Sequence, residues 1–157
     1  MQKTNKELLT ICILIPIAVG SISSLLSGNG MAAFEQVNQP PLSPPGFIFP
    51  VVWTILYTFM GIASYLILTS GGDKKDIRRA ITFYTAQLAV NFFWSIFFFR
   101  FSWYLFSFLW LLLLWGLILL CIHLFQKISK PAAWLMVPYL LWVTFAGYLN
   151  FSIWRLN

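Results

Sequence analysis

The chain has 157 residues, of which 60 % are hydrophobic, 19 % aromatic and only 9 % charged. Because soluble domains carry about 25 % charged residues, this composition excludes an ordinary water-soluble protein and predicts an integral membrane protein. The formal net charge of +6 does not indicate nucleic-acid binding, since the basic residues occur only between apolar segments and form no common face.

The N-terminal part of the chain predicts a first membrane-spanning helix. The apolar run 8–27 follows a basic stretch, and about 20 residues suffice to cross a hydrocarbon layer of about 30 Å. A cleavable signal peptide is the alternative. We favour a retained helix, because the run is longer than the apolar core of such peptides and lacks a clear cleavage site. Gly20, Ser24 and Ser27 give this helix a small-residue edge that suits close contact with another helix.

A polar, proline-rich loop at 28–46 leads directly into the second predicted span at 47–69. Four prolines between Pro40 and Pro45 fix the backbone and remove hydrogen-bond donors, which excludes regular helix there. Residues 31–37 could form a short amphipathic turn. We interpret the whole loop as a stiff lid above the helix that follows it.

Three further spans complete the chain, at 80–99, 103–125 and 132–154. Only a short turn separates the first two of these, so they must be antiparallel neighbours. A basic turn at 71–79 precedes them, with Asp73 or Asp76 placed to cap the next helix. We therefore predict an all-α integral membrane protein, a five-helix transmembrane bundle forming a single domain over residues 1–157.

The basic residues are distributed unequally between the two predicted membrane faces. One face holds Lys3, Lys6, Lys74, Lys75, Arg78, Arg79, Lys127 and Lys130. The opposite face holds only Arg100 and Arg155. Since Lys and Arg collect on the cytoplasmic side, this asymmetry predicts a multi-pass protein with a cytoplasmic N-terminus, an outer C-terminus and the lid on the outer side.

The predicted spans lack the ionisable groups that many chemistries require. All four acids lie in tails or loops, whereas ion-coupled pumps and proton relays usually need such groups at membrane depth. His123 could serve as a haem ligand, but we favour a solvent-facing position at a helix end. Cys12 and Cys121 lie within apolar runs and are interpreted as packing residues. Neither a metal-binding cluster nor a nucleophile with a base is present, so we predict no metal site and no hydrolytic activity.

Amides and aromatic residues recur at helical spacing within the spans. Because amides in lipid need hydrogen-bond partners, we expect Gln87, Asn91 and Asn150 to face the interior of the bundle. Counting about 1.5 Å per residue along each helix brings several of these side chains to the outer half of the bundle, beneath the loop. The residues that converge there are Trp53, Asn91, Trp94, Trp142 and Asn150, with Tyr57 one turn below Trp53.

This cluster has two interpretations on the residues alone. Apolar and aromatic walls, a few amides and a lid are typical of a ligand pocket. Plain packing explains Trp53, Trp94 and Trp142 equally well, and Asn91 and Asn150 could simply bond across helices.

Three motifs resemble the signatures of the translocator protein family, also called tryptophan-rich sensory proteins. The first begins at Pro40 and reads P-P-L-S-P-P-G-F-x-F-P-x-x-W-T-x-L-Y. The second is Gln87-Leu88-x-x-Asn91-x-x-Trp94-Ser95-x-x-Phe98, and the third is Trp142-x-x-x-Ala146-x-x-Leu149-Asn150. The resemblance covers essentially the whole chain and identifies it as a bacterial member, which implies a bacterial cell membrane.

The resemblance implies a homodimeric five-helix bundle that binds porphyrins such as protoporphyrin IX, with no required cofactor. It also implies a pocket under the first loop, in which animal members of the family bind isoquinoline- and benzodiazepine-type drugs. By motif position, the lining would include Pro44, Trp53, Asn91, Trp94, Trp142, Ala146 and Asn150. Bacterial members are also described as promoting light-dependent oxidative breakdown of the porphyrin, with tryptophans at the Trp53 and Trp142 positions implicated as catalytic residues.

Three functions therefore remain open: a porphyrin-binding sensor, a light-dependent porphyrin-degrading enzyme, and a transporter of porphyrin or other amphiphilic molecules. Sterol binding is not predicted. The family's sterol motif in animals needs a tyrosine where this chain has Phe151, and Tyr148 is one residue too far from Arg155 to replace it.

Overall fold

The computed structural model of the chain describes residues 5–28 and 30–157. Within these residues, five helices are long and apolar enough to cross a membrane, which confirms the predicted all-α membrane fold. They are α1 (Lys6–Leu26), α3 (Ile48–Leu68), α4 (Lys74–Ser95), α5 (Tyr104–Gln126) and α6 (Lys130–Leu156). Lys3 and Asn29, which belong to the predicted basic stretch and loop, lie outside the described residues.

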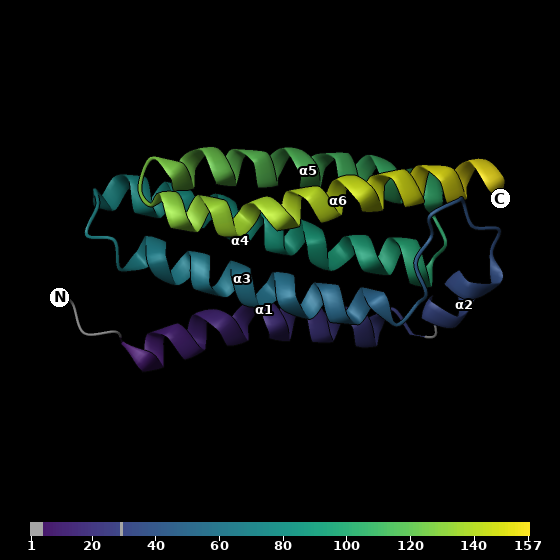
Figure 1. The fold of residues 1–157 in the computed structure, drawn as a ribbon, viewed down its shortest axis with the longest axis horizontal. Helices are drawn as coiled ribbons and strands as arrows, with labels where there is room; N and C mark the ends of the chain where they lie inside the picture. Colours follow the sequence, from purple (N-terminus) through teal and green to yellow (C-terminus); the bar gives the residue numbers. More distant parts are fainter. Residues whose placement is uncertain (1–4, 29) are drawn as a thin grey trace.

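The five helices lie side by side along one axis (Figure 1). α1 packs against α3, α3 against α6, α6 against α5, α5 against α4, and α4 returns to α1, so the helices close a ring. The large side chains that face outward are apolar: Leu14 is 56 % exposed, Leu109 55 % and Leu141 65 %. An apolar outer surface of this kind suits a bundle whose solvent is lipid.

The ends of the helices follow local capping rules. The Asp73 side chain accepts a hydrogen bond from the Lys75 backbone N–H at 2.8 Å. Of the two acids that the sequence offers as a cap for α4, Asp73 is therefore the one that caps it. Ser129 caps α6 in the same way, through the N–H of Ala132. α6 extends two residues beyond the predicted span at each end, because helical hydrogen bonding continues into the flanking polar residues.

α4 does not end as a regular α-helix. It continues into a π-helical turn, η1 (Ile96–Arg100), in which the backbone N–H of Phe101 bonds the carbonyl of Ile96 five residues earlier, at 3.2 Å. The turn to α5 then passes through Ser102 in the left-handed region, at a φ of 54°. A π turn is wider than an α turn and rotates the residues that follow it. The aromatic-rich sequence of this segment carries no signal of it.

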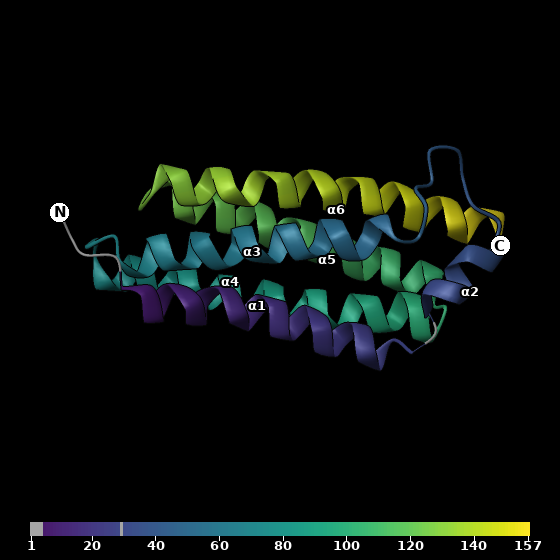
Figure 2. The same ribbon diagram turned by 60° about the horizontal axis from the view of Figure 1, so that its bottom comes forward.

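The predicted loop contains a short helix, α2 (Gly30–Gln36), which confirms the amphipathic turn expected at 31–37. Figure 1 and Figure 2 show α2 at the same end of the bundle as the C-terminus, and we call this the α2 end. The backbone N–H of Asn38 bonds the Asn157 side chain at 3.2 Å, and the Asn157 amide returns a bond to the Asn38 carbonyl at 3.0 Å. The Tyr148 hydroxyl bonds the carbonyl of Pro41 at 2.8 Å. The loop is therefore fastened to α6.

Two glycines allow α1 and α3 to approach each other closely. A Cβ atom on Gly61 would lie only 2.4 Å from the Cα of Ile13, so any larger residue would drive the two backbones apart. A Cβ on Gly20 would lie 2.1 Å from the ring of Tyr57. Of the predicted small-residue edge of α1, Gly20 makes the expected close helix contact and Ser27 contacts Ser95 on α4, whereas Ser24 is exposed.

Candidate functional site

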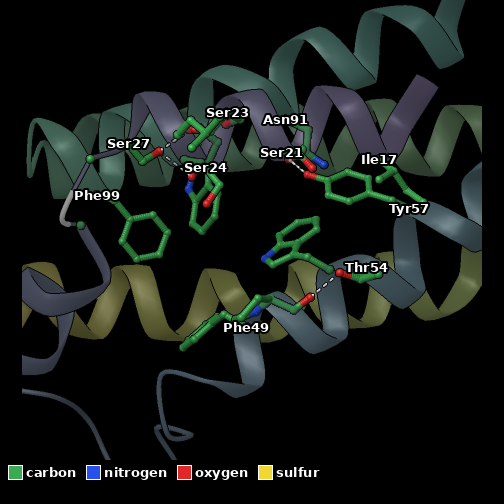
Figure 3. Close-up of a pocket in the computed structure, with 18 residues that line it drawn as sticks. Ile17, Ser21, Ser23, Ser24, Ser27, Phe49, Thr54, Tyr57, Asn91 and Phe99 are labelled. Atoms are coloured by element: carbon green, nitrogen blue, oxygen red, sulfur yellow. Dashed lines mark hydrogen bonds between the residues drawn. The ribbon is translucent and has the colours of Figure 1, made fainter. Parts of the chain in front are cut away.

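A cavity of about 550 Å³ lies between α1, α3 and the α4–η1 segment, toward the α2 end. Figure 3 shows Tyr57 and Asn91 at one end of the cavity and Phe99, on η1, at the other. The volume falls within the range of about 300 to 1,000 Å³ that is typical of small-molecule pockets. None of the described residues that line it carries a charged side chain.

α3 and α4 give the cavity an aromatic wall. Trp53 and Tyr57, one helical turn apart on α3, stack with ring centroids 5.5 Å apart and an angle of 27° between the ring planes. The Trp94 indole on α4 lies 6.4 Å from that of Trp53. Trp94 itself is buried, whereas Trp53 is partly exposed and forms part of the lining. The wall therefore offers an aromatic surface to a flat apolar ligand.

α1 gives the cavity a wall of hydroxyl groups. Ser21, Ser24 and Ser27 all contribute to the lining (Figure 3). The Oγ of Ser27 also lies 3.0 Å from the Oγ of Ser95 on α4. The sequence reasoning missed these residues as lining, because it assigned the small residues of α1 to helix contact alone. The signal was present in the spacing, since Ser21, Ser24 and Ser27 recur every three residues on one side of the helix.

The cavity opens on the flank of the bundle. Most of its exposed lining residues come from two helices, Ser21, Ser24 and Leu25 on α1 and Pro50 and Thr54 on α3; the remaining one is Gly28, in the loop that follows α1. The opening therefore lies where these helices separate toward the α2 end, beyond their close contact at Gly20. In a membrane this flank faces acyl chains.

A chain of buried hydrogen bonds supports the floor of the cavity. The Tyr57 hydroxyl donates to Asn91 Oδ1 at 3.4 Å, Asn91 Nδ2 donates to the Tyr139 hydroxyl at 2.7 Å, and that hydroxyl donates to Gln87 Oε1 at 2.8 Å. Gln87 and Asn91 are buried, as the sequence predicts. Because each group serves as the partner of the next, the chain satisfies polar groups that lipid cannot solvate and fixes the orientation of the Asn91 amide.

Asn150 supports the cavity from behind the aromatic wall. Its Oδ1 accepts a hydrogen bond from Trp94 Nε1 at 3.1 Å, and its Nδ2 donates to the carbonyl of Tyr104 at 2.7 Å. These bonds link α6 to α4 and α5. The cross-helix role that the sequence left open for Asn91 and Asn150 is therefore confirmed, and Asn91 lines the cavity as well.

The structure divides the predicted site residues into two groups. Those that line the cavity are Trp53, Tyr57, Asn91 and Trp94. Those that lie outside its lining are Pro44, Trp142, Ala146 and Asn150. Trp142 packs edge-on against Phe49, a lining residue, with ring centroids 5.8 Å apart. Trp142 Nε1 is buried and has no hydrogen-bond partner among the described residues.

The described residues contain no cluster of metal-ligating side chains. Within residues 5–28 and 30–157, no group of three or more His, Cys, Asp or Glu side chains is placed to hold a metal ion. The His123 side chain is exposed near the end of α5, away from the cavity. The donors and acceptors that the cavity can offer a ligand are therefore amide, hydroxyl and indole groups.

Comparison with known proteins gives matches along nearly the whole chain. A profile of the TspO/MBR family matches residues 12–155. Tryptophan-rich protein TspO from Chlorobaculum tepidum is 38 % identical over 156 residues, which cover 98 % of this chain and 99 % of that protein. Protein CrtK from Rhodobacter capsulatus is 34 % identical over 126 residues, covering 80 % of this chain and 79 % of the relative. The translocator protein of Bos taurus is 35 % identical over 131 residues, covering 83 % and 78 % respectively. With these matches and its five membrane-length helices, the chain belongs to the TspO/MBR family and is a multi-pass membrane protein.

Proposed function

We propose that this protein is a membrane sensor that binds a flat, amphiphilic tetrapyrrole, represented by protoporphyrin IX, in the cavity between α1, α3 and α4. The observation that carries the proposal is an uncharged cavity of about 550 Å³ with a stacked Trp53–Tyr57 pair in its wall. The names of relatives support a sensory role, including a tryptophan-rich sensory protein from Cereibacter sphaeroides that is 33 % identical over 124 residues. Isoquinoline- or benzodiazepine-type ligands would use the same wall.

The two predicted catalytic tryptophans have different parts in this proposal. Trp53 contacts the ligand directly, because it lies in the lining. Trp142 lies behind Phe49, so it acts by holding that ring in place and contacts the ligand only when Phe49 turns aside. Pro44, Ala146 and Asn150 contribute through the loop and α6 rather than by contact, Asn150 by orienting the Trp94 indole.

Titration of the purified protein with protoporphyrin IX, followed by tryptophan fluorescence and porphyrin absorption, tests this proposal. Trp53→Phe keeps a smaller aromatic ring and should therefore weaken binding roughly twofold to threefold, part of the value of one aromatic contact. Trp142→Phe should have a smaller effect. Trp134→Phe is the matched control, because Trp134 is 72 % exposed and does not line the cavity. An affinity of Trp53→Phe equal to that of Trp134→Phe would exclude this cavity as the binding site.

A light-dependent oxidative breakdown of the bound porphyrin is the second candidate function. The observation that favours it is the continuous aromatic cluster beside the cavity, in which the Trp53 ring lies 6.1 Å from that of Tyr139 and 6.4 Å from that of Trp94. Light absorbed by the porphyrin would supply the energy, dioxygen would be the oxidant and the porphyrin the compound oxidised, and the cluster would direct the reaction. Loss of the porphyrin absorption band under light should be faster with wild type than with Trp53→Phe. Equal loss with both proteins means ordinary photobleaching.

A transporter function is the alternative that the flank opening favours. An uncharged cavity that opens between α1 and α3 suits apolar or amphiphilic cargo, and relatives of this chain carry the name translocator protein. Porphyrin flux into liposomes tests it. A flux that matches protein-free vesicles removes this function and leaves the binding proposal intact.

Two further properties of the protein in its membrane remain predictions. The homodimer that the family resemblance implies is tested by the mass of the detergent-solubilised protein from light scattering. The orientation in a bacterial cell membrane, with a cytoplasmic N-terminus, is tested by labelling single cysteines placed in the α3–α4 turn and in the α2–α3 loop of intact cells. Labelling of the turn but not the loop would reverse the orientation.

A further inference from the structure

We propose that Arg100 recognises the anionic group of the ligand at the rim of the cavity, so that the site selects carboxylate-bearing amphiphiles over neutral ones. This inference rests on the proposed porphyrin-binding function and adds the charge specificity of that same site. Nothing in the resemblance or in the names of the relatives assigns a role to this residue.

The position of Arg100 follows from its two neighbours in space. It ends η1 directly after Phe99, which lines the cavity. Its side chain reaches across to the end of α1, where Nη1 donates a hydrogen bond of 2.9 Å to the carbonyl of Leu26. Leu26 itself lies between two lining residues, Leu25 and Ser27. The guanidinium is therefore held beside the α2 end of the cavity, and it is exposed.

The chemistry of the cavity places the charge of an amphiphilic ligand at this rim. Among the described residues, the lining offers aromatic rings and hydroxyl groups but no charged side chain, and a carboxylate buried there without a counter-charge would be strongly unfavourable. The anionic group must therefore stay at an open edge of the cavity. A guanidinium has several N–H donors in a planar fork that matches a carboxylate, and the bond to Leu26 uses only Nη1. Since the guanidinium makes no other hydrogen bond to the described residues, the rest of the fork can bind the ligand.

Arg155, which lies near the C-terminus at the same end of the bundle, provides a matched comparison. It is also exposed, but it lies on α6, which contributes no residue to the cavity lining. A general attraction of anions to this end of the bundle would involve both arginines. Recognition at the cavity rim involves Arg100 alone.

The test compares protoporphyrin IX with its uncharged dimethyl ester, both titrated in the same detergent. We expect wild type to prefer the diacid roughly threefold to fivefold, the upper range for an exposed ion pair. Arg100→Gln should lose this preference while binding the diester as wild type does, which also shows that its cavity is intact. Arg100→Lys should keep part of the preference, since it keeps the charge but not the fork. Arg155→Gln should keep all of it.

Each other outcome overturns the inference in a recognisable way. If wild type binds the two compounds equally, or if Arg100→Gln keeps the preference, Arg100 has no such role and the proposed function stands. If Arg155→Gln loses the preference as fully as Arg100→Gln does, the effect is general attraction to this end of the bundle. If neither compound binds wild type, the proposed function fails together with the inference.

Discussion

Replacing Gly20 with alanine should displace the Tyr57 ring and so disturb both the stability of the bundle and the cavity wall. The added Cβ would lie 2.1 Å from Tyr57 Cε2, whereas ordinary contact begins near 3.4 Å, so the ring must move by about 1.3 Å. The hydrogen bond from the Tyr57 hydroxyl to Asn91 is already 3.4 Å long, so we expect a shift of this size to break it. The stack on Trp53 is disturbed as well.

The expected loss is the sum of these two interactions. A hydrogen bond between membrane helices contributes about 0.6 kcal/mol on average and up to about 1.7 kcal/mol. A stacked aromatic pair contributes roughly 0.5 to 1.5 kcal/mol. Alanine offsets about 1 kcal/mol of this loss, because it is favoured over glycine in a helix interior. Gly20→Ala should therefore lower the free energy of unfolding by about 0 to 2 kcal/mol, measured by titration with SDS in mixed micelles. It should also weaken porphyrin binding, because Tyr57 lines the cavity.

Gly116→Ala is the matched control for this prediction. Gly116 is also inside a membrane helix, but a Cβ there would meet no atom within 4 Å. Alanine is favoured over glycine in a helix interior by about 1 kcal/mol, so this variant should be unchanged or more stable than wild type. If Gly20→Ala and Gly116→Ala shift the unfolding midpoint equally and in the same direction, the close contact between α1 and Tyr57 does not control stability.

Two further substitutions test the support of the cavity. Tyr139→Phe removes the hydroxyl that joins Asn91 to Gln87 and should cost about 1 to 2 kcal/mol in the same SDS titration, because two buried amides each lose a partner; a midpoint equal to wild type would show that these amides find other partners. Gly61→Ala should cost about 1 to 3 kcal/mol and be the harder change to accommodate, because its Cβ meets backbone atoms of Ile13 rather than a movable side chain; unchanged crosslinking between cysteines placed on α1 and α3 would contradict the expected separation of the helices.

The features that could be predicted from the sequence are those that depend on the lipid environment and on local helix signals. The five spans follow from apolar length, the cap at Asp73 from its position before a helix, and the inward-facing Gln87, Asn91 and Asn150 from the cost of an unpaired amide in hydrocarbon. Each of these depends on one segment and its solvent. None requires knowing which helix lies beside which.

The division of the predicted site residues could not be foreseen in the same way. Helical spacing and depth bring Trp53 and Trp142 to the same half of the bundle, but the packing order of the helices decides which indole meets open space. Phe49 stands between Trp142 and the cavity, and the serines of α1 complete the lining. The widening of α4 into η1, which sets Phe99 and Arg100 at the cavity end, likewise depends on tertiary packing.

For the ligand proposed above, the flank opening between α1 and α3 provides a route into the cavity from the bilayer. The loop at the α2 end is fastened to α6 through Asn38 and Asn157, whereas all the exposed lining residues except Gly28 belong to α1 and α3, so entry along this flank does not require those bonds to break. A compound that concentrates in the hydrocarbon meets the site at its concentration there, which exceeds its concentration in the surrounding solution. Occupancy then follows how the compound partitions between the two phases as much as how closely it fits.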